Sequence, residues 1–209
     1  MWTIFLLCLA YLIGSIPTSI ITGKLLRGID IREHGSGNPG ATNTFRVLGK
    51  KIGVTVGLVD IFKGFFCVVF LTALVPGDGI LSSDVRRIAA GLAAVAGHMW
   101  TVFAGFRGGK GVGTSFGVFL GLSPIPSLIA LVVWIALTFG TGYVSVGSIA
   151  AAVILPVSVI VEGYVRGGVS VPVAMIAAIL GALVVYRHRA NIGRLMRGEE
   201  NRFGKHGRS

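Results

Sequence analysis

The sequence predicts an all-helical, multi-pass membrane protein that forms one integral-membrane domain over residues 1–209. Hydrophobic residues make up 53% of the chain and charged residues only 13%, well below the roughly 25% that is usual in soluble domains. The mean hydropathy is +0.83. The 32 glycines follow no collagen period, and small residues are frequent where membrane helices pack together. One compact membrane domain is therefore the expected organisation.

Six apolar runs in the sequence are candidate membrane helices. They cover 2–23, 54–75, 88–104, 112–139, 144–162 and 170–186. A helix needs about 20 residues to cross about 30 Å of hydrocarbon, so five runs fit one crossing each, the third being somewhat short. The run 112–139 is longer, and the prolines of Ser123-Pro124-Ile125-Pro126 break it because each removes a helix hydrogen bond. We therefore expect seven helical segments, two of them short halves around the break at 123–126.

The basic residues gather in three places, which the positive-inside rule assigns to the cytoplasm. One cluster follows the first apolar run, one follows the third, and one occupies the C-terminal tail. Their members are Lys24, Arg27, Arg32, Arg46, Lys50 and Lys51; Arg107 and Lys110; and Arg187, Arg189, Arg194, Arg197, Arg202, Lys205 and Arg208. The tail reaches the cytoplasm only if 112–139 makes two passes or a re-entrant hairpin. The prediction is an N-terminus outside and a cytoplasmic C-terminus.

Composition also excludes several kinds of protein. The net charge of +11 does not indicate nucleic-acid binding, because no soluble domain is left to carry it. Cys8 and Cys67 lie inside apolar runs, so we expect them to pack in the interior without a disulfide or a metal. Motifs of metal ligands are absent from the sequence, and neither a metal nor a cofactor is expected. Residues 1–17 lack a basic start and resemble a first membrane span more than a cleaved signal.

The segment 35–51 is polar, glycine-rich and basic in a chain of membrane type. Its spacing of glycines fits G-x-G-x-x-G, but the dinucleotide motif needs a preceding strand and a βαβ unit, and an apolar helix precedes it here. Glycines let the backbone approach a ligand, and consecutive N–H groups can bind an anion. The other candidate ligands are small polar donors and one guanidinium: Ser36, Asn38, Thr42, Asn43 and Arg46. The alternative interpretation is a solvated turn.

The segment 97–111 ends in Arg107-Gly108-Gly109-Lys110-Gly111. It resembles a phosphate loop but fails the Walker pattern G-x-x-x-x-G-K-[ST]. A helix that starts directly after Lys110 would direct its positive end toward an anion. The alternative is a cytoplasmic loop with incidental charge. His98, at the end of an apolar run, is more consistent with a structural histidine than with a catalytic one.

The segment 186–204 carries His188, Asn191 and Arg194 at spacings of three residues, which would place them roughly on one side of a helix. His188 could act as a general base or bind phosphate, because histidine titrates near neutral pH. Glu200 is expected to pair with the neighbouring arginines in a structural role. In lipid, polar non-helical backbone is tolerated only where it is shielded or faces water. The three segments are therefore predicted to build one interfacial site for an anion.

Six motifs make the chain resemble the bacterial integral-membrane glycerol-3-phosphate acyltransferases that use acyl phosphate as donor. They are GSIP (14–17), SGNPGATNTFRVLGKKIG (36–53), DIFKG (60–64), GHMW with FRGGKGVGT (97–100 and 106–114), YVSVGS (143–148) and HRANIGRLMRGEEN (188–201). The motifs are long, ordered and spread over nearly the whole chain. Thr101, Gly113 and Gly142 depart from the residues common in the family, but none removes a polar group assigned to the reaction.

The resemblance implies the first acylation of phospholipid synthesis. Acyl phosphate and glycerol 3-phosphate would react at the sn-1 hydroxyl to give lysophosphatidic acid and inorganic phosphate. It places the enzyme in the bacterial inner membrane with its site on the cytoplasmic side, in contact with membrane lipids. The sequence carries no indication of oligomeric state.

The resemblance also suggests roles for individual residues. Arg46 and Lys110 would bind phosphate and developing oxyanion charge. Phosphate oxygens would be held by Ser36, Asn38, Thr42, Asn43 and the backbone of Gly108, Gly109 and Gly111. His188 and Asn191 would bind or orient glycerol 3-phosphate, and Ser145 is a further expected substrate-binding residue. There are two candidates for the acceptor of the hydroxyl proton, His188 and a substrate phosphate oxygen. Ser36 as a covalent nucleophile is disfavoured because no activating base lies beside it in sequence.

Two other functions compete with this interpretation. A small membrane transporter or channel for anions would use the same cations and helix ends, but it should place its polar groups near the bilayer midplane. The densest polar segments here fall at span ends and in loops. A non-catalytic membrane anchor would not need serine, asparagine and glycine in these arrangements.

Overall fold

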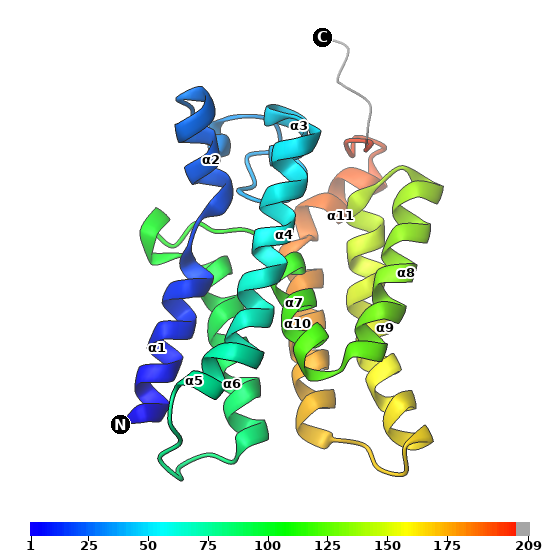
Figure 1. Ribbon diagram of the computed structural model, residues 1–209. Helices are drawn as coiled ribbons and strands as arrows, with labels where there is room; N and C mark the ends of the chain where they lie inside the picture. The colour runs from blue at the N-terminus through cyan, green and yellow to red at the C-terminus, as the bar shows by residue number, and fades with distance from the viewer. Residues whose placement is uncertain (204–209) are drawn as a thin grey trace. The chain divides into compact units, whose positions relative to one another are not determined.

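A computed structural model of the chain describes residues 1–203, and all regular structure in this part is helical (Figure 1). Two compact units can be distinguished, the first from Met1 to Leu122 and the second beginning at Ser123. The all-helical prediction is confirmed. The prediction of one domain over the whole chain stays a prediction. Lys205 and Arg208 of the predicted basic tail lie outside the described residues.

The first unit contains seven α-helices, two 3₁₀ turns and one π-helical turn. In chain order they are α1 (Trp2–Ser15), α2 (Thr18–Arg27), η1 (Ile31–Glu33), α3 (Ala41–Leu48), α4 (Lys50–Phe66), the π-helical η2 (Cys67–Leu71), α5 (Thr72–Leu74), α6 (Ser83–Met99), η3 (Val102–Ala104) and α7 (Val112–Leu122). Helix α1 packs along α6, and α4 packs along both α3 and α7.

Glycines allow the helices of the first unit to approach closely. A Cβ on Gly64 of α4 would overlap the carbonyl of Thr114 in α7, and one on Gly117 of α7 would overlap the carbonyl of Ile61. Gly14 and Gly97 fulfil the same role between α1 and α6. This is the packing of small residues typical of membrane helices.

A proline break separates α1 from α2. Helix α1 ends at Ser15, just before Pro17, which has no N–H group to continue the ladder. The last carbonyls of α1 therefore lack helical partners, and that of Ile16 accepts from the N–H of Thr18. The hydroxyl of Thr101 donates to the carbonyl of Ser15, and the ammonium of Lys63 donates to that of Ile16 at 3.3 Å. The break thereby draws α4 and the end of α6 to one point of the first unit.

The second unit consists of α8 (Pro124–Thr141), α9 (Val144–Val165), α10 (Val171–Arg187) and α11 (Arg189–Met196). Helix α9 packs against both α8 and α10. The indole N–H of Trp134 in α8 donates to the hydroxyl of Ser148 in α9 at 3.2 Å. Helices α10 and α11 meet at an angle of 52°.

Five helical segments of the described chain are long and apolar enough to cross a membrane. They are Trp2–Arg27, Lys50–Leu74, Ser83–Ala104, Pro124–Thr141 and Val144–Val165. The bent pair α10 and α11 forms a sixth if it is one span, and α7 is a shorter apolar helix. The number of crossings and the orientation of the termini stay predictions.

The apolar run 112–139 is broken where the prolines predicted, since α7 ends at Leu122 and α8 begins at Pro124. The prediction that both halves are short is wrong for the second. Helix α8 has 18 residues, about 27 Å at 1.5 Å per residue. It continues to Thr141 because Gly142 supplies the left-handed backbone, with φ 79°, that ends the helix.

The two cysteines differ in their surroundings. Cys67 is fully buried in the core between α1 and α6, as predicted, whereas Cys8 is exposed. The prediction of interior packing is therefore wrong for Cys8, which lies on the outer face of α1.

The predicted orientation can be tested with single cysteines in a variant in which both native cysteines are replaced by serine. Ile80→Cys lies in the exposed loop after α5, and Glu199→Cys is exposed after α11. We expect an impermeant thiol reagent applied to intact cells to label position 80 and not position 199. Labelling of position 199 under these conditions would contradict a cytoplasmic C-terminus.

Candidate active site

The first polar segment is organised by Asn43, whose side chain is almost completely buried. Its amide nitrogen donates to the carbonyls of Ile31 and His34, at 3.1 and 2.9 Å, and its amide oxygen accepts from the N–H of Ser36 at 2.8 Å. Gly35 adopts φ 62° directly against this amide. Asn43 thus holds the loop in shape, which is a different task from the predicted direct contact with substrate.

The remaining predicted ligands of the first segment surround this loop. Ser36 is exposed, Asn38 and Thr42 are half-buried, and Arg46 lies half-buried on α3. Gly40 precedes α3, so Thr42 sits in the first turn of that helix. The structure therefore presents hydroxyl, amide and guanidinium groups from one loop and the helix that follows it.

Arg32, just before the first segment, connects it to the second segment through a hydrogen bond. The guanidinium of Arg32 contacts the carboxylate of Asp30 at 2.7 Å and donates to the carbonyl of Ala104 at 3.0 Å. The hydrogen bond from Arg32 lowers the pKa of Asp30 to about 2. Asp30 is therefore ionised at neutral pH, and Arg32 ties the entry of the first segment to η3.

The second segment turns back along the end of α6. The N–H of Gly108 donates to the carbonyl of Met99, and that of Gly109 to the carbonyl of His98, both at 3.1 Å. These two N–H groups satisfy carbonyls that the end of α6 leaves without helical partners, and their predicted contact with phosphate stays a prediction. The amides of Lys110 and Gly111 follow, and α7 starts at Val112, as predicted.

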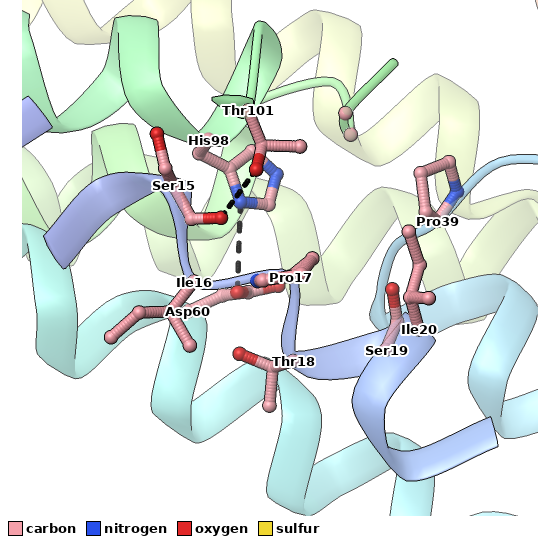
Figure 2. A pocket seen from close by; sticks show the side chains of 12 residues that line it. Ser15, Ile16, Pro17, Thr18, Ser19, Ile20, Pro39, Asp60, His98 and Thr101 are labelled. Atoms are coloured by element: carbon pink, nitrogen blue, oxygen red, sulfur yellow. Dashed lines mark hydrogen bonds and ion pairs between the residues drawn. The ribbon is translucent and has the colours of Figure 1, made fainter. Parts of the chain in front are cut away.

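The two polar segments meet in a small pocket of the first unit (Figure 2). Its volume is about 10 Å³, the room of roughly one water molecule. The first segment contributes Pro39 to the lining, and the second contributes His98, Gly108 and Gly109. These two segments therefore lie together, as predicted, whereas the convergence of all three segments on one anion site stays a prediction.

Three ionisable side chains form a buried cluster beside this pocket. The carboxylate of Asp60 and the ammonium of Lys63 lie 2.8 Å apart on α4. His98 of α6 places its Nδ1 2.8 Å from the Lys63 ammonium and 3.6 Å from Asp60. The three side chains are only 5–9% exposed. We did not predict Asp60 or Lys63 as functional residues.

The second unit has its own polar network around Glu200. Its carboxylate accepts from the hydroxyl of Ser145 at 3.0 Å, the amide of Asn191 at 2.6 Å and the guanidinium of Arg194 at 2.8 Å. The predicted pairing of Glu200 with a local arginine is confirmed. The network also occupies the Ser145 hydroxyl, so one contact connects α9, α11 and the chain that follows α11.

His188 lies at the break between α10 and α11 and is buried. The spacing predicted that His188, Asn191 and Arg194 share one continuous helix. This prediction is wrong for His188. The helix is interrupted at this residue, where the axis bends by 52°. Its Nδ1 is 2.8 Å from the carbonyl of Val184. Because a carbonyl only accepts, Nδ1 carries a proton, and in the neutral ring Nε2 carries the lone pair.

Comparison with known proteins identifies the family. A family model described as glycerol-3-phosphate acyltransferase matches residues 4–198. Curated glycerol-3-phosphate acyltransferases from Chlorobium phaeobacteroides strain BS1 and Chlorobaculum tepidum are each 43% identical. The first alignment covers 99% of this chain and 98% of the relative, and the second covers 96% and 97%. The chain belongs to the glycerol-3-phosphate acyltransferase family. It is an acyltransferase of phospholipid biosynthesis.

Two crystal structures of PlsY (YgiH), an integral-membrane glycerol 3-phosphate acyltransferase, share the fold. The glycerol 3-phosphate form has a TM-score of 0.84 at 43% identity and covers 97% of this chain and 96% of that one. The lysophosphatidic acid form has a TM-score of 0.81 at 42% identity, with coverages of 97% and 95%. The acyltransferase is thus a multi-pass membrane protein of the PlsY family.

Asp60 and Lys63 were missed although the sequence carries a signal for them. They stand three residues apart inside the apolar run 54–75, and ionisable residues within a membrane span are costly unless they are paired. A search for charged pairs at i and i+3 within apolar runs would have selected them. Their connection to His98, which lies 35 residues beyond Lys63, cannot be predicted without the fold.

Glu200→Gln should lower the free energy of unfolding of the acyltransferase by about 1–3 kcal/mol, because buried charge-assisted hydrogen bonds are lost. The matched control is Glu199→Gln. That carboxylate pairs with Arg197 on the surface, where both side chains are about 60% exposed, so we expect almost no change. Thermal unfolding in detergent measures both variants. Equal losses for both substitutions would contradict the structural role of the Glu200 network.

The stabilisation by Glu200 should also depend on pH. Burial raises the pKa of this carboxyl, but hydrogen bonds from Asn191, Arg194 and Ser145 outweigh burial and hold the pKa below its ordinary value of 4.5. A lowered native pKa stabilises the fold above the unfolded-state pKa, and the contribution is lost as pH falls through the native value. The difference between wild type and Glu200→Gln should therefore be full at pH 6–7 and shrink below about pH 4.5.

Proposed function

We propose that this acyltransferase takes its acyl group from acyl phosphate and transfers it to the sn-1 hydroxyl of glycerol 3-phosphate. The products are lysophosphatidic acid and inorganic phosphate. Neither acyl-CoA nor acyl carrier protein is the direct donor. The proposal places the enzyme in the bacterial inner membrane, with its site at the cytoplasmic face, where the basic clusters gather.

The observation that carries this proposal is the meeting of two glycine-rich, cationic segments in the first unit. Pro39 and the Gly108–Gly109 turn line the same pocket, so the segments that carry Arg46 and Lys110 are folded against each other. Both proposed substrates bear phosphate, and the acyl donor also has a lipid tail. Cations and backbone amides at the end of membrane helices suit such molecules.

In the proposed reaction the C1 hydroxyl oxygen of glycerol 3-phosphate attacks the acyl carbonyl carbon. A new ester C–O bond forms, the carbon–oxygen bond to phosphate breaks, and inorganic phosphate leaves with the bonding electron pair. An acyl phosphate is already activated, so the protein chiefly has to orient two anions and stabilise charge on the carbonyl oxygen. Arg46 and Lys110 are the proposed cations for this task.

The hydroxyl proton needs an acceptor, and we assign Nε2 of His188 to this role. The hydrogen bond of Nδ1 to Val184 supports the assignment, because it puts the lone pair of the neutral ring on Nε2. A phosphate oxygen of the substrate is the alternative acceptor. Asn191 is proposed to orient glycerol 3-phosphate, and its amide is itself held by Glu200 at 2.6 Å.

The other predicted site residues divide by their surroundings. Ser36, Asn38 and Thr42 are proposed to contact phosphate oxygens directly, together with the amides of Lys110 and Gly111. Asn43 and Ser145 support the site indirectly in this proposal, since Asn43 is hydrogen-bonded to the loop and Ser145 to Glu200. Ser36 is assigned to binding and not to covalent catalysis.

The test uses purified protein in lipid with palmitoyl phosphate and radiolabelled glycerol 3-phosphate, and palmitoyl-CoA as the parallel donor. We expect lysophosphatidic acid from palmitoyl phosphate alone, with the chain on the sn-1 oxygen by NMR. Product only from the thioester would overturn the donor, and a chain on the sn-2 oxygen would overturn the regiochemistry. Counterflow of phosphate across liposomes without ester product would favour the transporter instead.

A further inference from the structure

The ammonium of Lys63 has all three of its hydrogens accounted for. It lies 2.8 Å from a carboxylate oxygen of Asp60, 2.8 Å from Nδ1 of His98 and 3.3 Å from the carbonyl of Ile16. An ammonium has three donors and no acceptor. A buried cation is tolerated when it is paired and hydrogen-bonded in this way. Lys63 is therefore held in one place by α4, α6 and the break between α1 and α2.

This geometry defines the state of His98. Because the ammonium can only donate, Nδ1 of His98 must accept, and the proton of the neutral ring resides on Nε2. Asp60 is 3.6 Å from Nδ1, which is too long for a hydrogen bond. Its carboxylate instead fixes the ammonium that fixes the ring. In Figure 2 the His98 ring lies above the Asp60 carboxylate, next to the backbone of Ile16 and Pro17.

The other edge of the His98 ring faces the place where the two polar segments meet. A Cβ added to Gly109 would overlap Nε2 of His98, and the same Cβ would lie 3.2 Å from the carbonyl of Pro39. The backbone carbonyl of His98 also accepts from the N–H of Gly109. One residue thus touches the turn of the second segment through both its ring and its backbone, directly before Lys110.

We propose that His98, oriented by Lys63 and Asp60, is a positioning residue for acyl transfer. Its Nε2–H edge fixes the position of the Gly109 turn against Pro39 of the first segment. The position of the next residue, Lys110, follows from that of the turn. This inference rests on the proposed role of Lys110 in binding phosphate. Displacement of a substrate-binding group by about 1 Å can lower the rate about 100-fold, so the effect of the cluster should be visible in catalysis.

The rival explanation is that the cluster only stabilises the fold. Replacing both Asp60 and Lys63 by apolar residues distinguishes this explanation from the positioning role of His98. Removing one partner of a buried ion pair leaves an uncompensated charge, whereas replacing both by apolar residues is often neutral. Lys63→Met alone should therefore lower the melting temperature strongly. Asp60→Leu combined with Lys63→Met should recover it. Lys51→Met, an exposed lysine of the same helix, is the matched control and should change neither stability nor activity.

The decisive readout is kcat/KM with palmitoyl phosphate and glycerol 3-phosphate at matched melting temperature. We expect the double variant to recover stability and still lose about 10- to 100-fold in kcat/KM, because the His98 ring is no longer fixed. Recovery of both stability and kcat/KM would overturn the proposal. Wild type in the same assay separates this outcome from a wrong donor, since a wrong donor gives no product with any variant.

A pair of His98 variants tests the same idea without removing the ion pair. Glutamine can place an amide N–H near the position of Nε2, whereas asparagine reaches only the position of Nδ1. We expect His98→Gln to keep at least 10-fold more kcat/KM than His98→Asn when both are folded. Equal values would show that the Nε2–H edge does not matter and would overturn the proposal. If the double variant does not fold, this pair alone decides.

Discussion

Arg46→Ala is expected to lower kcat/KM of the acyltransferase by at least about 150-fold. Arg46 is the guanidinium that the first polar segment offers from α3, and its planar fork matches phosphate. If it binds phosphate, its removal leaves a charged partner unpaired, at a cost of about 3 kcal/mol or more of transition-state binding. Each 1.36 kcal/mol corresponds to a tenfold change in rate. Steady-state kinetics with palmitoyl phosphate and glycerol 3-phosphate measures the effect.

Arg27→Ala is the matched control, since this arginine lies in the same basic cluster but is exposed at the end of α2. It should keep wild-type kinetics. Arg46→Lys separates charge from geometry, because lysine keeps the charge and loses the two-pronged contact, and we expect an intermediate value. An Arg46→Ala protein with near-wild-type turnover and a normal melting temperature would remove Arg46 from the reaction.

Much of the fold follows from composition and from the proline break at 123–126. The apolar runs predicted the helices, and Ser123-Pro124 marks the end of α7 and the start of α8. The length of α8 was underestimated, because Gly140 and Thr141 look like loop residues although the helix continues to the left-handed Gly142. The short loops that carry the site have no such periodicity, and their shape depends on contacts distant in sequence.

The residue types of the site were predictable, but not the way each group is used. Asn43 was predicted as a substrate ligand, but its side-chain amide makes three hydrogen bonds to the loop backbone. The N–H groups of Gly108 and Gly109 were predicted to bind phosphate, but they donate to carbonyls at the end of α6. A polar group in a glycine-rich segment can serve the backbone or a ligand, and only the tertiary structure distinguishes the two.

His188 illustrates the same limit at a helix end. Its spacing from Asn191 and Arg194 indicated one helical face, but the chain bends by 52° at this residue. At the bend the imidazole of His188 is buried, and its hydrogen bond to the Val184 carbonyl places a proton on Nδ1. Spacing thus predicted which residues gather in the second unit, through Asn191, Arg194 and Glu200, and failed where the helix is interrupted.

His188→Gln is expected to lower kcat about 100-fold or more at neutral pH, because general-base catalysis typically contributes 10²–10⁴-fold and an amide cannot take up the hydroxyl proton. The melting temperature shows whether the buried site tolerates the change. His188→Asn is the companion variant, since its amide lies near the position of Nδ1 and can still donate to the Val184 carbonyl. Both variants lack the base, so both should show the loss in kcat.

The alternative acceptor predicts a different pattern. If a substrate phosphate oxygen takes the proton, His188 only binds glycerol 3-phosphate, and its replacement should raise KM for that substrate while kcat stays nearly unchanged. The pH profile adds an independent readout. A general base must be deprotonated to act, so it gives wild type an acidic limb in kcat/KM, which should vanish in His188→Gln. A limb that persists in a folded His188→Gln protein would assign the proton to the substrate.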